Sequence, residues 1–316
     1  MNRILCCQSI LFSLSTFYNR YWRASRIAAN QFPDGRRIRQ RNRFVSTIVL
    51  KQKFKSLLKD TRTLARVGFQ PALQQKIVFL HVPKCGGTSL DIAIQQSFGR
   101  RNLRPRGVYK LDPAVSAAAA KLANMPIADY RENLLFYYLG LEDAYYVKGH
   151  FTFSDDAYRT FSALWHFISL IREPTARWIS HYFFNRYKQD DHFRIEIPLE
   201  DFVETDRGRS LGHNMVSFFG GSEVRGKPIS QASLDAAIAN VERLSVVGVL
   251  EHLDKFAVDY ERRFGVRLRI DHRNRNPVNN VHEHASLTPS MLRKIESVCE
   301  PDIALYQHVL NHRLGK

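Results

Sequence analysis

The amino-acid sequence predicts an α/β fold in which a parallel sheet lies between helices on both of its faces. Short apolar runs rich in β-branched residues occur at 76–82, 167–171 and 246–250. Each run is followed by a turn and then by a segment with helical spacing, which is the order of a βα unit. The 316-residue chain also contains 21 Phe and 13 Tyr, which are enough large side chains to fill a sizeable core.

The first βα unit begins with the strand expected over 76–82. The turn 83–87 interrupts this apolar run with a proline and two glycines. A helix is expected over 88–98, because its apolar residues recur on one face, and Gly99 is its expected stop.

The remaining elements are predicted by the same patterns. A run at 145–148 predicts a further strand. Pro174 marks the start of a helix over 175–187, because a proline at the first helical position loses no hydrogen bond. Downstream, the sequence predicts a last short strand over 267–270 and helices over 233–244, 252–264, 288–300 and 302–314.

The net charge of +17 is concentrated near the N-terminus. Residues 1–66 hold 15 Lys and Arg against 2 acidic residues, so they carry +13 and the other 250 residues carry only +4. Nucleic-acid binding would need a basic face on the fold itself, so no nucleic-acid partner is expected. The sequence therefore predicts a basic leader over 1–74 and a folded domain over 75–316.

The leader admits several interpretations. Ile4–Tyr18 is apolar but interrupted by polar residues, and its roughly 15 residues are too few to cross a bilayer as a helix. It is a weak anchor, an Arg-rich address peptide or a disordered leader. Residues 49–66 have the pattern of a basic amphipathic helix, which could lie on an anionic membrane or pack on the domain. Residues 1–66 thus predict at most a weak association with a membrane surface.

The cysteines do not indicate a secreted, disulfide-linked protein. The chain has four of them, Cys6, Cys7, Cys85 and Cys299, of which two lie in the leader. They do not form a disulfide framework, and no Asn-x-Ser/Thr glycosylation site occurs in the chain.

The turn after the first strand has the composition of an anion-binding loop. Gly86 and Gly87 allow a ligand to approach the backbone closely. Thr88 and Ser89 open a helix, so their N–H groups are free and the helix dipole favours an anion there. Lys84 adds a mobile cation to the same loop.

This loop differs from the loop that binds nucleoside triphosphates with Mg²⁺. That loop reads Gly-x-x-x-x-Gly-Lys-Ser/Thr, whereas Lys84 precedes the glycines in this chain. The strand over 167–171 ends in Arg172 and not in an Asp that could organise a metal ion. The sequence therefore predicts a cationic site without a metal.

A second cluster of polar residues follows the strand over 167–171. Arg172 stands at the end of the strand, and Ser180 lies two turns into the next helix. An Arg and a hydroxyl in these positions can hold a second phosphate. Taken alone, the first motif also fits a structural glycine turn, and the second fits a surface Arg beside a helical Ser.

The two motifs, in this order and about 90 residues apart, resemble those of sulfotransferases that use 3′-phosphoadenosine-5′-phosphosulfate (PAPS). The resemblance is closest to the branch of heparan- and chondroitin-type carbohydrate sulfotransferases and their bacterial relatives. It covers residues 75–310 and implies a three-layer sheet of the P-loop type, preceded here by the basic N-terminal extension. The residues implied for the 5′-phosphosulfate are Pro83, Lys84, Cys85, Gly86, Gly87, Thr88 and Ser89, and those implied for the 3′-phosphate are Arg172 and Ser180.

Three shorter segments add to the resemblance. They are Lys148–Phe151, which contains a Gly-His-Phe sequence, Val247–Leu253, and the Asp302-x-x-Leu305-Tyr306 sequence of the last helix. The resemblance implies that His150 is the base for the acceptor hydroxyl, and an ordinary histidine pKa of about 6.5 suits that role. Lys84 would stabilise the leaving group. His181, His166 and Glu251 remain alternative bases.

The acceptor of the implied reaction is a hydroxyl compound, with a carbohydrate as the expected class. Asn214–Gly220 and His272–Asn276 could line its cleft, although the second segment could also be a solvated loop or part of the nucleotide clamp. The aromatic run Tyr182–Phe184 is expected in the core and not as a sugar platform.

Two other functions remain open at this point. One is a kinase or nucleoside-triphosphate hydrolase on a related α/β fold, which Lys84 and Arg172 disfavour. The other is a non-catalytic relative that binds polyanions or membranes through its leader. The lack of a full anchor, disulfides and glycosylation sites favours a bacterial cytoplasmic enzyme, associated with a membrane at most weakly, over an enzyme of the Golgi membrane.

Overall fold

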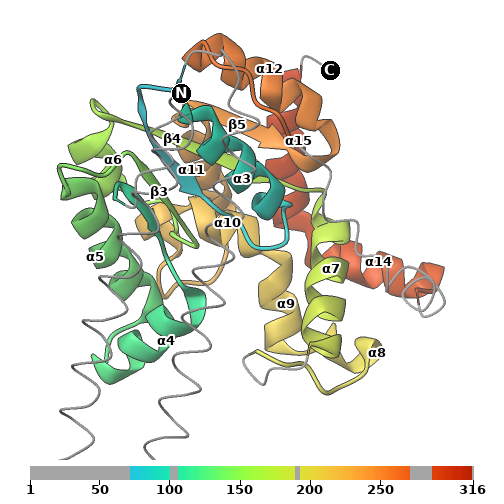
Figure 1. The fold of residues 1–316 in the computed structure, drawn as a ribbon. Helices are drawn as coiled ribbons and strands as arrows, with labels where there is room; N and C mark the ends of the chain where they lie inside the picture. The colour runs from blue at the N-terminus through green and yellow to red at the C-terminus, as the bar shows by residue number, and fades with distance from the viewer. Residues whose placement is uncertain (1–71, 100–105, 189–192, 271–286, 315–316) are drawn as a thin grey trace, which may run out of the picture. The chain divides into compact units, whose positions relative to one another are not determined.

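The computed structural model describes residues 72–99, 106–188, 193–270 and 287–314. The expected leader over 1–74, the amphipathic helix over 49–66 and the loop His272–Asn276 lie outside these ranges, apart from residues 72–74. Within the described parts, strands and helices alternate along the chain (Figure 1). No helix in these ranges is both long and apolar enough to cross a membrane.

Five parallel strands form one sheet in the order β2-β3-β1-β4-β5. The strands are β1 (Lys76–Leu80), β2 (Val108–Lys110), β3 (Tyr146–Gly149), β4 (Trp165–Ile171) and β5 (Val246–Val249). At the end of β1, Leu80 lies in register with Gly149 of β3 on one side and Ser169 of β4 on the other. The α/β class with a parallel sheet is therefore confirmed.

The helices predicted from the sequence are present, with boundaries that differ by a few residues at most. They are α3 (Gly87–Ser97), α7 (Pro174–Tyr187), α11 (Gln231–Glu242), α12 (Leu253–Phe264), α14 (Pro289–Val298) and α15 (Glu300–Leu314). The structure adds further helices that the sequence patterns did not predict: α4 (Pro113–Leu122), α5 (Ile127–Gly140), α6 (Asp155–Phe161), α8 (Leu199–Phe202), α9 (Asp206–Gly212) and α10 (Asn214–Phe219).

The predicted strand over 267–270 is wrong. The segment has no regular secondary structure. Leu268 is buried between exposed arginines, and this alternation imitates a strand. Leu268 instead packs into the core beside Phe264 of α12, and the segment joins none of the five strands. Leu268 is buried by packing against the core, so the alternating pattern of side chains occurs here without pairing to a neighbouring strand.

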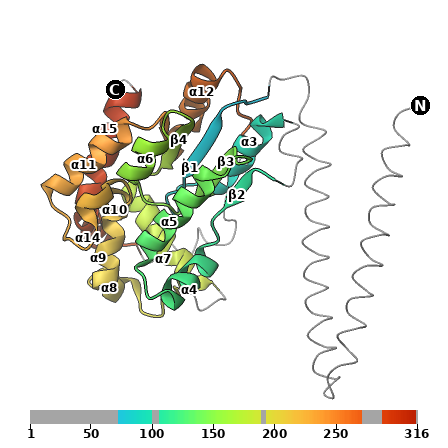
Figure 2. The ribbon, with the colours of Figure 1, turned by 90° about the vertical axis from the view of Figure 1, so that its left-hand side faces the viewer.

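Helices cover both faces of the sheet, because side chains of each strand alternate between the two faces. On one face, Ile77 and Phe79 of β1 pack with α3 and α12. On the other face, Val78 and Leu80 belong to a core that includes residues of α5, α6, α10, α11 and α15. The sheet is therefore the middle of three layers (Figures 1 and 2).

A smaller apolar core lies outside these layers. Trp178 of α7 packs with Phe202 of α8, Leu211 of α9 and Ile295 of α14. The indole N–H of Trp178 donates to the Gly208 carbonyl over 2.8 Å, so the ring is fixed at both its apolar and its polar edge. This core supports α7, the helix that carries Ser180.

Candidate functional site

The three central strands of the sheet are β3, β1 and β4, and their carboxyl ends lie side by side. After β1 the chain adds β2 and then β3 on one side of β1, and only later adds β4 and β5 on the other side. A crevice at the carboxyl ends of parallel strands is expected where the order reverses in this way, and ligands of α/β proteins bind there. Three segments converge at this point: the loop after β1, His150 after β3, and Arg172 after β4.

The loop after β1 turns directly into α3. Lys84 has a φ of 68° and Gly86 a φ of 71°, so two residues of the loop take the left-handed conformation. For a lysine this conformation is sparsely populated, and it is held here by the surrounding structure. Gly86 is the N-cap of α3 and has no side chain that could satisfy the first N–H groups of the helix. These N–H groups and the positive end of the helix dipole therefore form a cradle for an anion.

Both glycines of the loop lie against side chains. A Cβ at Gly86 would come within 2.5 Å of Leu250 Cδ1, which belongs to the short helix η3 (Leu250–His252) after β5. A Cβ at Gly87 would collide with the imidazole of His81. The predicted requirement for glycine at these positions is thus explained partly by packing and, at Gly86, also by the positive φ.

Lys84 is oriented towards α7. Its Nζ lies 3.6 Å from the centroid of the Phe184 ring, and its carbonyl accepts a hydrogen bond of 3.3 Å from Arg172 Nη1. Phe184 is 50% exposed, whereas Tyr182 and Phe183 are buried. The prediction of core positions is therefore right for Tyr182 and Phe183 and wrong for Phe184, which instead provides a cation–π contact for the lysine of the loop.

Cys85 points away from the cradle. Its side chain is fully buried in the core beneath the sheet, and its thiol lies 3.7 Å from the Pro83 carbonyl. Burial raises the pKa of the thiol to about 12, against the opposing effect of the nearby Arg177 and Arg172. Cys85 can therefore contribute only its backbone to a ligand, and it is not a nucleophile.

The imidazole of His150 is held next to the loop by a hydrogen bond to the backbone. Its Nδ1 lies 2.6 Å from the carbonyl oxygen of His81, and a carbonyl can only accept, so Nδ1 carries the proton. This tautomer leaves Nε2 with a lone pair, as a general base requires. Burial lowers the pKa of His150, the bond to His81 opposes this effect, and the charges of Arg131 and Lys148 lower the pKa further.

The imidazole of His81 lies between the His150 ring and the start of α3. The two imidazole centroids are 4.7 Å apart, and the His81 ring lies against Gly87. Burial, followed by the charges of His150 and Lys148, lowers the pKa of His81 to about 2, so this ring is neutral at every physiological pH. A side chain at position 87 would collide with the His81 ring, which lies against the His150 imidazole.

A buried carboxylate lies behind the two histidines. Asp91 on α3 accepts from Lys110 Nζ at 2.7 Å, Lys148 Nζ at 3.2 Å and the Tyr146 hydroxyl at 2.9 Å. Burial alone would raise the pKa of Asp91, but the two lysine charges outweigh it and hold the pKa below its ordinary value. Asp91 thus fixes Lys148, which lies two residues before His150. The only sequence signal for this cluster is an acidic residue on the buried face of a predicted helix.

The turn after β4 is organised by two glutamates. The Glu173 carboxylate accepts from the N–H groups of Thr175 and Ala176 at 2.9 and 2.6 Å and so caps α7. Glu251 accepts from the Glu173 N–H at 3.2 Å, and the Tyr306 hydroxyl donates to it over 3.4 Å. These bonds join the turns after β4 and β5. They give Glu251 a structural role, whereas the sequence left it as an alternative base.

Ser180 lies one helical turn before Phe184 on α7, so both residues share the face that meets Lys84. His181 follows on this helix, and burial, with a further contribution from the charges of Arg177 and Lys84, lowers its pKa to about 3. His166 lies near the start of β4, at the opposite end from Arg172, and its Nδ1 lies 3.2 Å from the Ser245 hydroxyl. His166 is therefore not placed to act as the base at the loop.

Arg177 belongs to the core of the domain and not to the ligand surface. It is fully buried, pairs with the equally buried Asp302 at 3.6 Å, and donates to the Asn214 side chain at 3.3 Å. The Asp302 carboxylate accepts from the N–H groups of Met215 and Val216, each at 2.8 Å, which caps α10. Sequence analysis named Asp302 and Asn214 in two separate segments, and the structure joins them to Arg177 through long-range contacts.

The segment Asn214–Gly220, which the sequence offered as a possible wall of the acceptor cleft, is largely part of the core. Its residues Met215, Val216, Phe218 and Phe219 are buried against the sheet. The apolar period of a short amphipathic helix accounts for this segment without a ligand.

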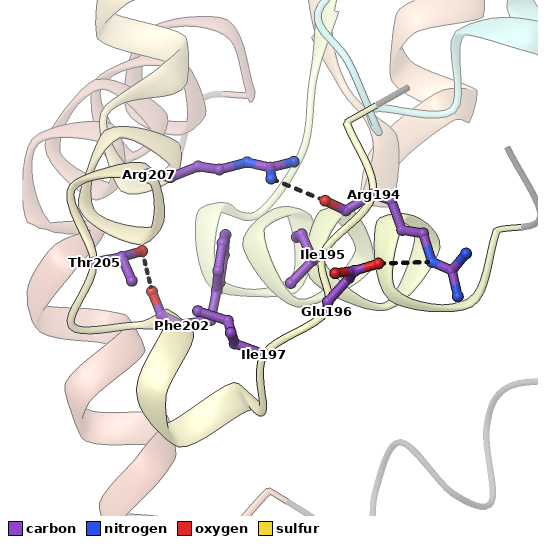
Figure 3. Close-up of a pocket in the computed structure, with 7 residues that line it drawn as sticks. All are labelled: Arg194, Ile195, Glu196, Ile197, Phe202, Thr205 and Arg207. Carbon is purple, nitrogen blue, oxygen red and sulfur yellow. Dashed lines mark hydrogen bonds and ion pairs between the residues drawn. The ribbon is translucent and has the colours of Figure 1, made fainter. Parts of the chain in front are cut away.

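A cavity of about 420 Å³ lies beside α8 and α9, and none of the predicted site residues lines it. Figure 3 shows its seven lining residues, Arg194, Ile195, Glu196, Ile197, Phe202, Thr205 and Arg207. Arg207 donates to the carbonyls of Phe193 and Arg194, and Arg194 pairs with Glu196 at 3.9 Å. These arginines hold the loop before α8 in place, and no pattern in the sequence marked this loop as a cavity wall.

The structure thus brings together the glycine loop, His150 and Arg172, with Ser180 on the helix that meets Lys84. This arrangement could hold an anion at the start of α3, beside an imidazole whose pKa is lowered and whose proton is on Nδ1. No protein-family model matches the chain, and no curated protein matches it either, so the assignment of a function depends on this geometry.

Proposed function

We propose that this protein is a PAPS-dependent sulfotransferase that acts on a hydroxyl acceptor, with a carbohydrate as the expected class. The observation that carries the proposal is the position of His150 beside the cradle: its Nδ1 proton is bonded to the loop carbonyl of His81, so Nε2 can accept a proton. A base in this protonation state, next to a helix start that favours an anion, is suited to group transfer from an anionic donor to a hydroxyl.

The loop would hold the 5′-phosphosulfate in the manner of a P-loop. The first N–H groups of α3, with the hydroxyls of Thr88 and Ser89, would bind the terminal oxygens. Lys84 would leave the Phe184 ring and neutralise charge on the leaving group. A partly exposed cation–π contact is worth only about 0.5–1 kcal/mol, so a polyanion can compete for the lysine.

Arg172 and Ser180 would hold the 3′-phosphate. Arg172 donates one hydrogen bond to the Lys84 carbonyl, which ties its guanidinium to the loop. Ser180 lies one helical turn before Phe184 on α7, so it would face the same side of the helix as the ring that meets Lys84. An arginine and a hydroxyl on adjacent elements suit the planar recognition of a phosphate.

In the transfer step the acceptor oxygen forms a bond to sulfur while the bond from sulfur to the phosphate oxygen breaks. His150 Nε2 takes the proton of the acceptor hydroxyl, and Lys84 stabilises the charge that develops on the leaving phosphate oxygen. The products are a sulfate ester and adenosine 3′,5′-bisphosphate. Neither Cys85 nor Arg177 takes part in any of these steps.

Incubation with labelled PAPS and a panel of glycans tests this proposal. Wild-type protein should transfer the label, and Lys84→Ala should lower transfer by at least about 100-fold, because it removes the cation at the leaving group. Lys121→Ala removes the same charge from an exposed position on α4 and should transfer the label as the wild type does.

Two results would contradict the proposal. Equal transfer by wild type and Lys84→Ala would show that the lysine of the loop has no catalytic part. Strictly Mg²⁺-dependent turnover of ATP, without metal-independent binding of adenosine 3′,5′-bisphosphate, would identify the protein as a kinase or triphosphate hydrolase instead.

A further inference from the structure

Two neighbouring helices place three metal-binding side chains together, in a group separate from the glycine loop. Glu242 is the last residue of α11, and His308 and His312 lie four residues apart on α15. Since residues at this spacing share one helix face, both imidazoles lie on the same side of α15. The two helices pack against each other on one side of the sheet (Figure 2).

The three side chains approach one another closely. His308 Nε2 lies 2.9 Å from a Glu242 carboxylate oxygen, and the His308 and His312 ring centroids are 4.1 Å apart with the planes inclined by 24°. One ligand atom from each of the three residues lies within 4.8 Å of the other two. Around a tetrahedral zinc ion with bonds of about 2.0–2.2 Å, ligand atoms are about 3.4 Å apart, so small side-chain rotations suffice.

We propose that Glu242, His308 and His312 form a binding site for a divalent transition-metal ion, and that Zn²⁺ is the ion best suited to it. Two imidazoles and one carboxylate are a ligand set that zinc accepts, whereas Mg²⁺ and Ca²⁺ prefer oxygen ligands alone. Glu242 and His312 are exposed, so a water molecule can complete the coordination. This proposal does not depend on the proposed sulfotransferase activity.

The surroundings of the site indicate a structural role for the metal. In hydrolases with two histidines at this spacing, a glutamate directly follows the first histidine and acts as the base. In this chain Val309 occupies that position, and it is buried in the core. A bound ion would instead join the end of α11 to α15, the helix whose first half carries Asp302 and Tyr306.

His312 distinguishes a metal site from a simple ion pair between His308 and Glu242. The contact between His308 and Glu242 would stabilise the protein modestly without any metal, because the two side chains carry opposite charges when His308 is protonated. An ion pair of this kind does not involve His312. A metal site requires it, so replacement of His312 distinguishes the two.

The test is thermal unfolding of the full-length protein, purified without a polyhistidine tag, with and without Zn²⁺. At a free zinc concentration about 100 times the Kd, the wild-type Tm should rise by about 5–10 °C, because only the folded protein presents the three ligands together. His312→Ala should lose most of this rise, and Glu242→Gln should reduce it. Mg²⁺ should not raise the Tm.

Asn311→Ala is the matched control, because Asn311 is exposed on the same turn of α15 and is not a ligand. It should show the full zinc-dependent rise. Metal binding elsewhere in the chain would raise the Tm of wild type and His312→Ala alike. The proposal is overturned by equal rises in these two proteins, or by the absence of a rise in the wild type.

Discussion

At the residue scale, one hydrogen bond sets the tautomer of His150, and its burial and the charges around it lower its pKa. The His81 carbonyl fixes the Nδ1 proton, so Nε2 is basic and its direction is set by the backbone of the loop. Arg131 of α5 donates to the His150 carbonyl at 3.5 Å, and Lys148 lies on β3, two residues before His150. These two cations and the burial of the ring favour the neutral imidazole.

His150→Asn tests the proposed base without removing its hydrogen bond to the backbone. An asparagine Nδ2 can replace Nδ1 as the donor to the His81 carbonyl, but it cannot accept the proton of the acceptor. We expect kcat for sulfuryl transfer to fall by about 10²–10⁴-fold with little change in Tm. If His150→Asn keeps the wild-type kcat, another group is the base.

The pH profile of wild-type transfer provides a second readout for the same residue. A base whose pKa is lowered stays neutral to a lower pH, so activity should decline only as the pH falls through a value below 6.5. His150→Asn should lack this acidic limb. A midpoint above 6.5 would contradict the assignment.

At the scale of elements, α7, α10 and α15 are joined by one buried ion pair. Arg177 and Asp302 are both fully buried, and the Asp302 carboxylate also caps α10. Burial raises the pKa of Asp302 to about 6, against the opposing effects of Arg177 and of the backbone N–H groups. The pair therefore connects the helix that carries Ser180 with two helices on one face of the sheet.

Asp302→Asn should lower the free energy of unfolding by about 3–5 kcal/mol, because it leaves the Arg177 charge buried without its partner. The new amide also presents a donor to the N–H groups of Met215 and Val216. Denaturant unfolding measures the change. Asp156→Asn is the control, since it removes an acid from the exposed pair with Arg159, and its effect should stay within about 1 kcal/mol. Similar effects of the two substitutions would contradict the structural role of Asp302.

Short-range patterns account for the elements that sequence analysis found. The β1 strand, the glycine turn and the start of α3 follow one another within 15 residues of chain, and Pro174 and Glu173 mark the start of α7 locally. β2 has three residues, too few for a period to be recognised, and α5 has a mixed surface that gives no clear apolar face. The segment 267–270 shows the reverse error, because its alternation reflects packing against α12 rather than strand pairing.

At the scale of the whole molecule, several buried titratable groups couple stability to pH. Burial is the main cause that lowers the pKa of His81 to about 2 and that of His181 to about 3. Both rings therefore stay neutral in the folded protein, while in the unfolded chain they bind protons below their ordinary pKa of about 6.5. Asp302 acts in the opposite sense between about pH 6 and its ordinary value of 3.8, because the folded protein holds its proton more tightly.

We expect the free energy of unfolding to fall on acidification below about pH 6.5, by up to about 1.4 kcal/mol per pH unit for each of the two histidines, with Asp302 offsetting part of the loss. Urea unfolding between about pH 7 and about pH 5 measures this dependence. His181→Asn removes one titrating group and should show a shallower decline. A stability that is constant or rises over this range would show that the two rings are not buried and neutral.

The sequence by itself determined the α/β class, the order of most elements and the position of the glycine turn between β1 and α3. These features depend on patterns within a few consecutive residues, and such patterns act through local backbone preferences. Only the tertiary structure decided that β1 lies between β3 and β4, that His150 bonds to His81, and that Phe184 meets Lys84. It also decided that Glu242 meets His308 and His312. The physical reason is that contacts between segments far apart in the chain depend on how the layers pack, and no spacing along the sequence encodes that distance.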